Sequence, residues 1–171
     1  NIFAQGPLDY AAATPFLTRV LDATHPCSRI ILAFRSWADM RANRLWKLQS
    51  DSATGEYYSG LKLLIAGRDR TQLWDSLIWN SINNHAKEER DSGMRLATIN
   101  FGYGEKKGVR APSYNRQPDG TINFSTADKP TLFMQLTDIV NGTKRSELRV
   151  IIETWAVFSV TDGRGGLKFG N

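Results

Sequence analysis

The sequence predicts an all-β domain built as a sandwich of two antiparallel sheets, with one short helix near residues 70–83. Six or seven segments have strand-like length and apolar patterning, and Gly, Pro and Asn turns separate them at short spacing. A single segment has the four-residue apolar spacing of a helix. The 171 residues fit one domain and can bury a hydrophobic core.

Two clear strands are expected in the first half of the chain. In CSRIILAFRSW, residues 27–37, the apolar side chains of Ile30, Leu32 and Phe34 alternate with a mixed face. The second, GLKLLIAG over residues 60–67, is bounded by a glycine at each end. We therefore expect both segments to contribute one apolar face to the core.

The segment after residue 68 has a different periodicity. Leu73 and Leu77 are four residues apart, the spacing of one helix face. Asp69 is placed to be the N-cap, with Gln72 as the reciprocal half of a capping box. We expect this helix to end near residues 83–84.

The second half of the chain predicts further strands. Apolar and polar residues alternate over residues 94–104, and two more strands are expected at 121–125 and 131–139. Asn-Gly at 141–142 is a strong hairpin signal, because both central residues of a type I′ turn need positive φ. The returning strand, 147–160, is nearly continuously apolar, which is typical of a strand in the middle of a sheet.

Composition and charge narrow the classes of partner. The net charge is +5, but the basic residues are scattered rather than gathered into a stripe, so no specific nucleic-acid binding is expected. No apolar run approaches the ~20 residues of a membrane helix, so no membrane insertion is expected. A single cysteine, Cys27, fits a reducing compartment. The start at Asn1, without a Met or a signal peptide, suggests a piece of something longer.

The sequence offers no convincing catalytic, metal or cofactor site. His25 and His85 are sixty residues apart, and His85 lies in a charged segment, so a metal site is not expected. Cys27 borders a core strand and is expected to be a small buried hydrophobe. Three carboxylates could in principle pair as in a glycosidase, although structural roles are favoured: Asp69, Asp75 and Glu153. We therefore expect no enzymatic activity and no cofactor.

Two formal N-glycosylation sequons are present, at Asn123 and Asn141. The first falls in a predicted strand and the second in a predicted hairpin turn. We regard both as possible glycosylation sites and favour the structural interpretation.

The last fifty residues have a recognisable order. Pro-x-Gly precedes Ile-Asn-Phe-Ser, an Asp and a Thr-Leu strand, and after a Leu-Arg-Val strand the chain ends in Gly-Gly-Leu-x-Phe-x-Asn. This order resembles the C-terminal end of the double jelly-roll major capsid proteins of nucleocytoplasmic large DNA viruses and their relatives. The residues that carry the resemblance are Gly120, Asn123, Phe124, Ser125, Asp128, Leu132, Gly166, Leu167 and Asn171.

The resemblance implies a fold and a domain organisation. Residues 25–171 would form a single jelly-roll β-sandwich of two antiparallel sheets, the C-terminal half of a double jelly-roll capsid protein. Residues 1–24 would be a lead-in, or linker, from a preceding jelly roll.

The resemblance also implies a structural role. The chain would build the icosahedral virion shell as part of a homotrimer, the pseudo-hexameric capsomer, after assembly in the host cell cytoplasm. Its partners would be copies of itself, neighbouring capsomers and minor capsid proteins. The alternative is a carbohydrate-binding β-sandwich module, which predicts a monomer with tryptophans exposed on one face, whereas Trp74, Trp79 and Trp155 fall at positions where core or subunit packing is more common.

Overall fold

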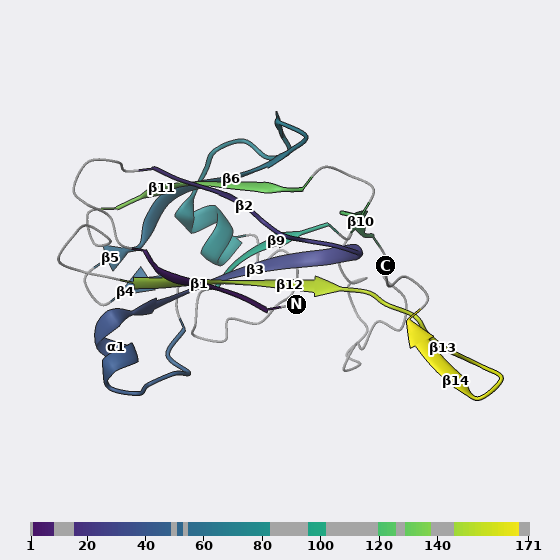
Figure 1. Ribbon diagram of the computed structural model, residues 1–171. Helices are drawn as coiled ribbons and strands as arrows, with labels where there is room; N and C mark the ends of the chain where they lie inside the picture. Colours follow the sequence, from purple (N-terminus) through teal and green to yellow (C-terminus); the bar gives the residue numbers. More distant parts are fainter. Residues whose placement is uncertain are drawn as a thin grey trace, which may run out of the picture.

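The protein is a sandwich of two antiparallel β-sheets, as Figure 1 shows. The computed structural model describes residues 2–8, 16–48, 51–52, 55–82, 96–101, 120–125, 129–137 and 146–167. The predicted all-β class is confirmed. Residues 128, 141–142 and 171, on which several sequence-based expectations depend, lie outside the described residues.

The first sheet has five strands and is centred on β3 (Pro26–Ser36). On one side, β12 (Ser146–Thr154) pairs with β3, and β1 (Ile2–Leu8) pairs with β12. On the other side, β9 (Ala97–Asn100) and β10 (Ile122–Asn123) pair with different parts of β3. The prediction that the strand beginning near residue 147 lies inside a sheet is therefore confirmed.

The second sheet also has five strands and is centred on β6 and β11. Its edge strand β2 (Phe16–Val20) pairs with β11 (Thr131–Leu136), which pairs with β6 (Tyr58–Ile65). The short strands β7 (Arg68–Asp69) and β8 (Trp74–Asp75) pair with the far side of β6. All of these pairings are antiparallel.

The strand order is that of a jelly roll. Apart from the two-residue strands β10 and β7, one sheet runs β1-β12-β3-β9 and the other β2-β11-β6-β8, so the chain passes repeatedly from one sheet to the other. Eight strands connected in this way form two Greek keys, which defines the jelly-roll sandwich. The fold predicted from the resemblance is therefore confirmed.

Residues 1–24, which the sequence suggested to be a lead-in, supply two strands of this sandwich. β1 pairs along β12 from Ile2 opposite Ile151 to Leu8 opposite Ser146, and β2 pairs along β11. The sandwich thus begins before residue 25, where the sequence analysis placed its start. β2 has a weak period-two signal, because Leu17 is its only buried residue.

The helical segment begins later than predicted. Residues 76–77 are helical and lead into η1 (Ile78–Ile82), a single turn of π-helix. Asp69 is not an N-cap; it lies in β7, where Lys62 Nζ contacts its two carboxylate oxygens at 3.0 and 3.2 Å. Residues 68–69 pair with β6 in a hairpin, so their backbone is extended and cannot begin a helix. The N-terminal end of the helical segment is capped by Asp75, whose Oδ1 accepts a hydrogen bond from the Leu77 N–H at 2.8 Å.

The predicted strand 147–160 is interrupted. β12 ends at Thr154, and a separate hairpin follows, formed by β13 (Phe158–Thr161) and β14 (Arg164–Leu167). The Trp155 N–H donates to the Pro26 carbonyl at 2.8 Å, and Pro26 is the first residue of β3. Before Pro26 the neighbouring chain turns away at His25, whose backbone N–H and carbonyl are bonded to Ser125 and Phe124, so β12 has no partner to pair with beyond this point. Figure 1 shows the hairpin standing away from the sandwich.

Two smaller features complete the described chain. Helix α1 (Trp37–Arg41) follows β3 directly, with Ser36 as its N-cap, and it was not predicted from the sequence. Strands β4 (Asp51–Ser52) and β5 (Gly55–Glu56) form a two-stranded ribbon. Both lie at the opposite end of the sandwich from the β13–β14 hairpin (Figure 1).

The hydrophobic core lies between the two sheets and draws on strands from both. Phe34 of β3 stacks on Tyr57, with ring centroids 5.0 Å apart, and lies near Tyr58 of β6. The side chains that have less than 2% of their surface exposed include Ile30, Leu32, Phe34, Tyr58, Leu61, Leu63, Leu132, Met134, Leu148 and Val150. Buried residues alternate along β11, and in β3 the residues Ile30, Leu32 and Phe34 are buried as their alternation in the sequence predicted.

Candidate assembly surfaces

The Asn-Phe-Ser motif holds a turn at the start of β3. His25 has a φ of 71°, the left-handed conformation, which is costly for a residue with a Cβ. Its N–H donates to Ser125 Oγ at 2.9 Å, and its carbonyl accepts the Phe124 N–H at 3.3 Å. Asn123 Oδ1 in turn accepts the Ser125 N–H at 2.9 Å. The motif thus stabilises the turn from which the central strand begins.

The other predicted signature residues have varied positions. Phe124 is buried and packs edge-on against Phe101, with ring centroids 5.8 Å apart, and Leu132 is fully buried in β11. Gly120 is half-buried, whereas Gly166 and Leu167 are exposed on the β13–β14 hairpin. Asp128 and Asn171 lie outside the described residues, as does the possible glycosylation site Asn141. Asn123, the other possible site, is exposed and stays a prediction.

The residues considered for catalysis are not brought together into an active site. Asp69 is paired with Lys62, and Glu153 with Arg29, each as a local cross-strand contact. Burial raises the pKa of the Cys27 thiol to about 12, so the reactive thiolate is suppressed. Within the described residues, no three His, Cys, Asp or Glu side chains gather as metal ligands, and no helix is long and apolar enough to cross a membrane. His85 lies outside the described part of the chain.

A buried ion pair joins the two central strands of the first sheet. Arg35 of β3 and Glu147 of β12 are opposite each other in register, and their side chains are only 2% and 7% exposed. Arg149 Nε also contacts Glu147 Oε1 at 3.0 Å. Arg35 Nη1 donates to the Leu45 carbonyl at 2.9 Å, so the pair also holds the loop after α1.

That loop is held from a second side by Asp39. Its buried carboxylate accepts a hydrogen bond from Ser36 Oγ at 2.6 Å and contacts Arg44 Nε at 2.8 Å and Lys47 Nζ at 3.6 Å. The Ser36 hydrogen bond is the main reason that the pKa of Asp39 is lowered below its usual value. The loop therefore has a fixed backbone, although its apolar tip, Trp46, is 83% exposed. Sequence reasoning missed this network, because Arg35 and Glu147 are far apart in the chain and carry no local signal.

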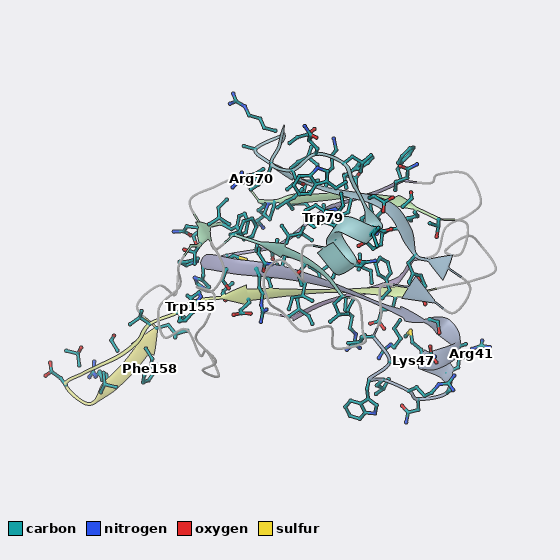
Figure 2. The ribbon with its side chains drawn as sticks, turned by 180° about the vertical axis from the view of Figure 1, so that it is seen from behind. Arg41, Lys47, Arg70, Trp79, Trp155 and Phe158 are labelled. Carbon is teal, nitrogen blue, oxygen red and sulfur yellow. The ribbon has the colours of Figure 1, made fainter. Side chains whose placement is uncertain are left out.

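The tryptophans are distributed between core and surface. Trp79 of η1 is buried, and its indole N–H donates to the Leu61 carbonyl at 3.0 Å. Trp74 rests against Trp79 with ring centroids 5.2 Å apart and is 40% exposed. Figure 2 shows Trp79 between the two sheets and Trp155 at the base of the β13–β14 hairpin. Together with Trp46, these residues do not share one exposed face.

The comparisons with known proteins agree with this architecture. No protein-family model matches the chain. The major capsid protein of Chrysochromulina ericina virus is 28% identical over 113 residues, which is 64% of this chain and 18% of that protein. The chain is similar to a viral major capsid protein. The resemblance stated from its signature residues is thereby confirmed.

Solved structures of capsid proteins have the same fold. The PBCV-1 virus capsid model matches all of this chain and 49% of its own, with a TM-score of 0.68 and 14% identity. The Faustovirus major capsid protein matches 89% of this chain and 31% of its own, with a TM-score of 0.62 and 11% identity. The major capsid protein P2 of bacteriophage PM2 gives a TM-score of 0.55 at 10% identity. The chain thus spans half or less of these proteins.

Proposed function

We propose that the chain is a structural part of a viral major capsid protein and serves as its C-terminal jelly roll. The observation that carries the proposal is the jelly-roll order of eight strands in a chain similar in sequence to a major capsid protein. A shell subunit needs a rigid sandwich and exposed surfaces that meet its neighbours, and it needs no catalytic residues. The match to about half of longer capsid chains supports a second jelly roll before this one.

The finer proposal concerns assembly. Two jelly rolls per chain and three chains would make a homotrimeric, pseudo-hexameric capsomer, which packs with neighbouring capsomers and minor capsid proteins into an icosahedral shell assembled in the host cytoplasm. Obligate contacts of this kind usually bury more than ~2,000 Å². The buried Arg35–Glu147 pair and the braced loop at Trp46 give the sandwich the rigidity that such packing requires.

The decisive experiment is to express the whole reading frame that contains this chain and to measure its mass in solution by light scattering after gel filtration. A trimer that forms pseudo-hexagonal particles in negative-stain electron microscopy is the expected result. A stable monomer that forms no such particles would overturn the proposal.

A second candidate, a carbohydrate-binding module, is favoured by one observation, the 83% exposure of Trp46. Sugars stack on exposed aromatic rings, and a Trp46→Ala variant would then lose binding to oligosaccharides in calorimetry. Because Trp79 is buried and Trp74 half-covered, the described residues assemble no exposed aromatic platform of the kind that such modules use. The capsid function is therefore the better supported of the two.

A further inference from the structure

The second sheet has an outer face, the side that points away from the first sheet (Figure 1). The register identifies its residues. Leu17, Met134 and Leu61 lie side by side across β2, β11 and β6 and are buried in the core. Because side chains alternate along a strand, the positions between them point outward. Three rows across the strands form the outer face: Phe16, Gln135 and Gly60, then Thr18, Phe133 and Lys62, then Val20, Thr131 and Leu64.

Contacts between the strands confirm that these side chains share one face. The rings of Phe16 and Phe133 stack with their centroids 5.5 Å apart, and Lys62 Nζ lies 5.3 Å from the centre of the Phe133 ring. Leu73 belongs to the same face, because a Cβ added to Gly60 would come 3.0 Å from Leu73 Cδ1. The outer face is therefore a packed surface with an aromatic centre.

The outer face is apolar although it is open to solvent. The solvated side of an antiparallel sheet normally carries polar side chains. Here Phe16, Val20 and Leu73 are 47%, 59% and 45% exposed, and Leu64 and Phe133 are half-buried. Together they expose apolar surface on the order of 300 Å², the size of the largest patch on a typical monomer, which is often functional.

The charges on the outer face leave it suited to an apolar partner. Lys62 Nζ contacts Asp69 Oδ1 at 3.0 Å, so covering this pair does not bury a lone charge. Asp75 lies in the strand at the far margin of the face, where its Oδ1 accepts the Leu77 N–H. The outer face of the first sheet is different, because the ion pairs between β3 and β12 cross it.

The edge of the second sheet, in contrast, is protected against the addition of another strand. β2 is the outermost strand, and its Arg19 lies opposite the core residue Leu132. The exposed Arg19 side chain is therefore on the core-facing side of an open edge. Inward-pointing charges of this kind discourage edge-to-edge pairing of sheets. A partner is therefore expected on the outer face rather than at the edge.

We propose that the outer face of the second sheet is the docking surface for the preceding jelly roll of the same polypeptide. The inference rests on the proposed function, in which such a roll forms the first half of the capsid protein. This chain spans 49% and 50% of two capsid chains of the same fold, which leaves room in them for one further roll.

The size of the outer face favours a roll of the same polypeptide over a second copy of this chain. Separate proteins that bind stably usually bury ~800 Å² on each partner. Domains of one chain meet through interfaces as small as ~600 Å² in total, since the linker supplies a high effective concentration. Two copies that met through the same face would also form a closed pair, which is not the three-chain capsomer proposed above.

Thiol labelling of the whole protein, expressed from the reading frame that contains this chain, tests the contact. Thr18→Cys places a thiol in the central row of the outer face, and Thr161→Cys places one on the polar side of the β13–β14 hairpin; both positions are exposed in this chain. In the folded whole protein the Thr18→Cys thiol should react at least ~10-fold more slowly than in urea. The Thr161→Cys thiol should react at nearly the same rate in both.

Two matched variants show whether the apolar side chains hold the contact. Phe16→Ser with Val20→Ser should raise the labelling rate of Thr18→Cys in the folded whole protein several-fold. Phe158→Ser with Val160→Ser makes the same two changes on the hairpin, which Figure 2 shows away from the second sheet, and should leave that rate unchanged. All four side chains are about half exposed or more, so neither variant removes core packing.

The 171-residue chain alone supplies the last comparison, because it lacks the preceding roll. Its Thr18→Cys thiol should react almost as fast as in urea. Protection in this chain alone would assign the contact to a second copy, and protection lost when trimers are diluted to monomers would assign it to a neighbouring subunit; either result would overturn the proposal. So would a Thr18→Cys thiol that reacts freely in the whole protein. If that protein still forms trimers in light scattering, the docking surface alone is refuted and the proposed function stands.

Discussion

Removal of the buried carboxylate at Glu147 should be the most damaging conservative change in the described part of the sandwich. The substitution Glu147→Gln leaves the Arg35 guanidinium, which is 2% exposed, without a counter-charge. Breaking one side of a buried ion pair typically costs about 3–5 kcal/mol. Arg149, which is one-third exposed, loses the same partner but can turn toward water, so we expect the lower end, about 3 kcal/mol.

The same two strands provide a matched control. Glu153 and Arg29 also face each other across β12 and β3, but their side chains are 45% and 35% exposed. The identical change, Glu153→Gln, should therefore cost less than about 1 kcal/mol, because water screens this pair and can solvate the remaining charge. Burial is the main difference between the two sites, since both join an Arg of β3 to a Glu of β12; the Glu147 site has in addition the contacts of Arg149 and the Leu45 carbonyl.

Equilibrium unfolding in urea, followed by circular dichroism, measures both variants. For a domain of this size, about 3 kcal/mol corresponds to a fall in melting temperature of roughly 6–12 °C. A third variant, Arg35→Met with Glu147→Leu, removes both charges and should recover most of the loss, since apolar replacements of a buried pair are often neutral. Equal losses in Glu147→Gln and Glu153→Gln, or a double variant less stable than the single one, would refute this reasoning.

Three further changes test other parts of the fold. Trp79→Phe removes the donor to the buried Leu61 carbonyl and should lower stability by about 1–3 kcal/mol in urea unfolding; an unchanged midpoint would contradict that role. Cys27, with its pKa raised to about 12 by burial, should react with a thiol reagent at mildly alkaline pH only after urea is added, and prompt reaction of the folded chain would show that it is accessible. The Ser36 hydroxyl lowers the pKa of Asp39 below 3.8, so the ionised carboxylate stabilises the fold above that pH. The stability lost in Asp39→Asn should shrink as the pH falls below 3.8, and a difference that does not change with pH would contradict the assignment.

The strands that the sequence predicted correctly are those whose burial pattern is local. β11 alternates between buried and half-buried positions along its whole length, and β3 does so from Ile30 to Leu32 before it becomes continuously buried to Arg35; the alternation is visible in the sequence. Their ends are set by neighbours far along the chain. The apolar run after Thr154 continues to Val160, but pairing stops at Trp155 because the neighbouring chain turns away at His25, just before Pro26. The sequence of residues 147–160 therefore does not indicate that β12 ends at Thr154.

Charged side chains misled the sequence analysis for a similar reason. Asp69 has the residue type and spacing of a helix N-cap, yet it pairs with Lys62 across a tight hairpin. That hairpin depends on Ala66 and Gly67, whose φ angles of 53° and 71° reverse the chain within two residues. Alanine is seldom found in that conformation, so of the two turn residues only Gly67 indicated a tight turn in the sequence.

The Asn-Phe-Ser motif and the end of strand β12 meet at the same place, the turn before β3. The Asn-Phe-Ser segment binds both backbone groups of His25, and the next residue, Pro26, accepts the last hydrogen bond of the β12 strand from Trp155. Three distant segments therefore meet at one end of the first sheet, where the β13–β14 hairpin leaves the sandwich. The Asn-Phe-Ser motif, one of the features that carry the resemblance to capsid proteins, therefore holds the turn at which the first sheet ends and from which the hairpin leaves it.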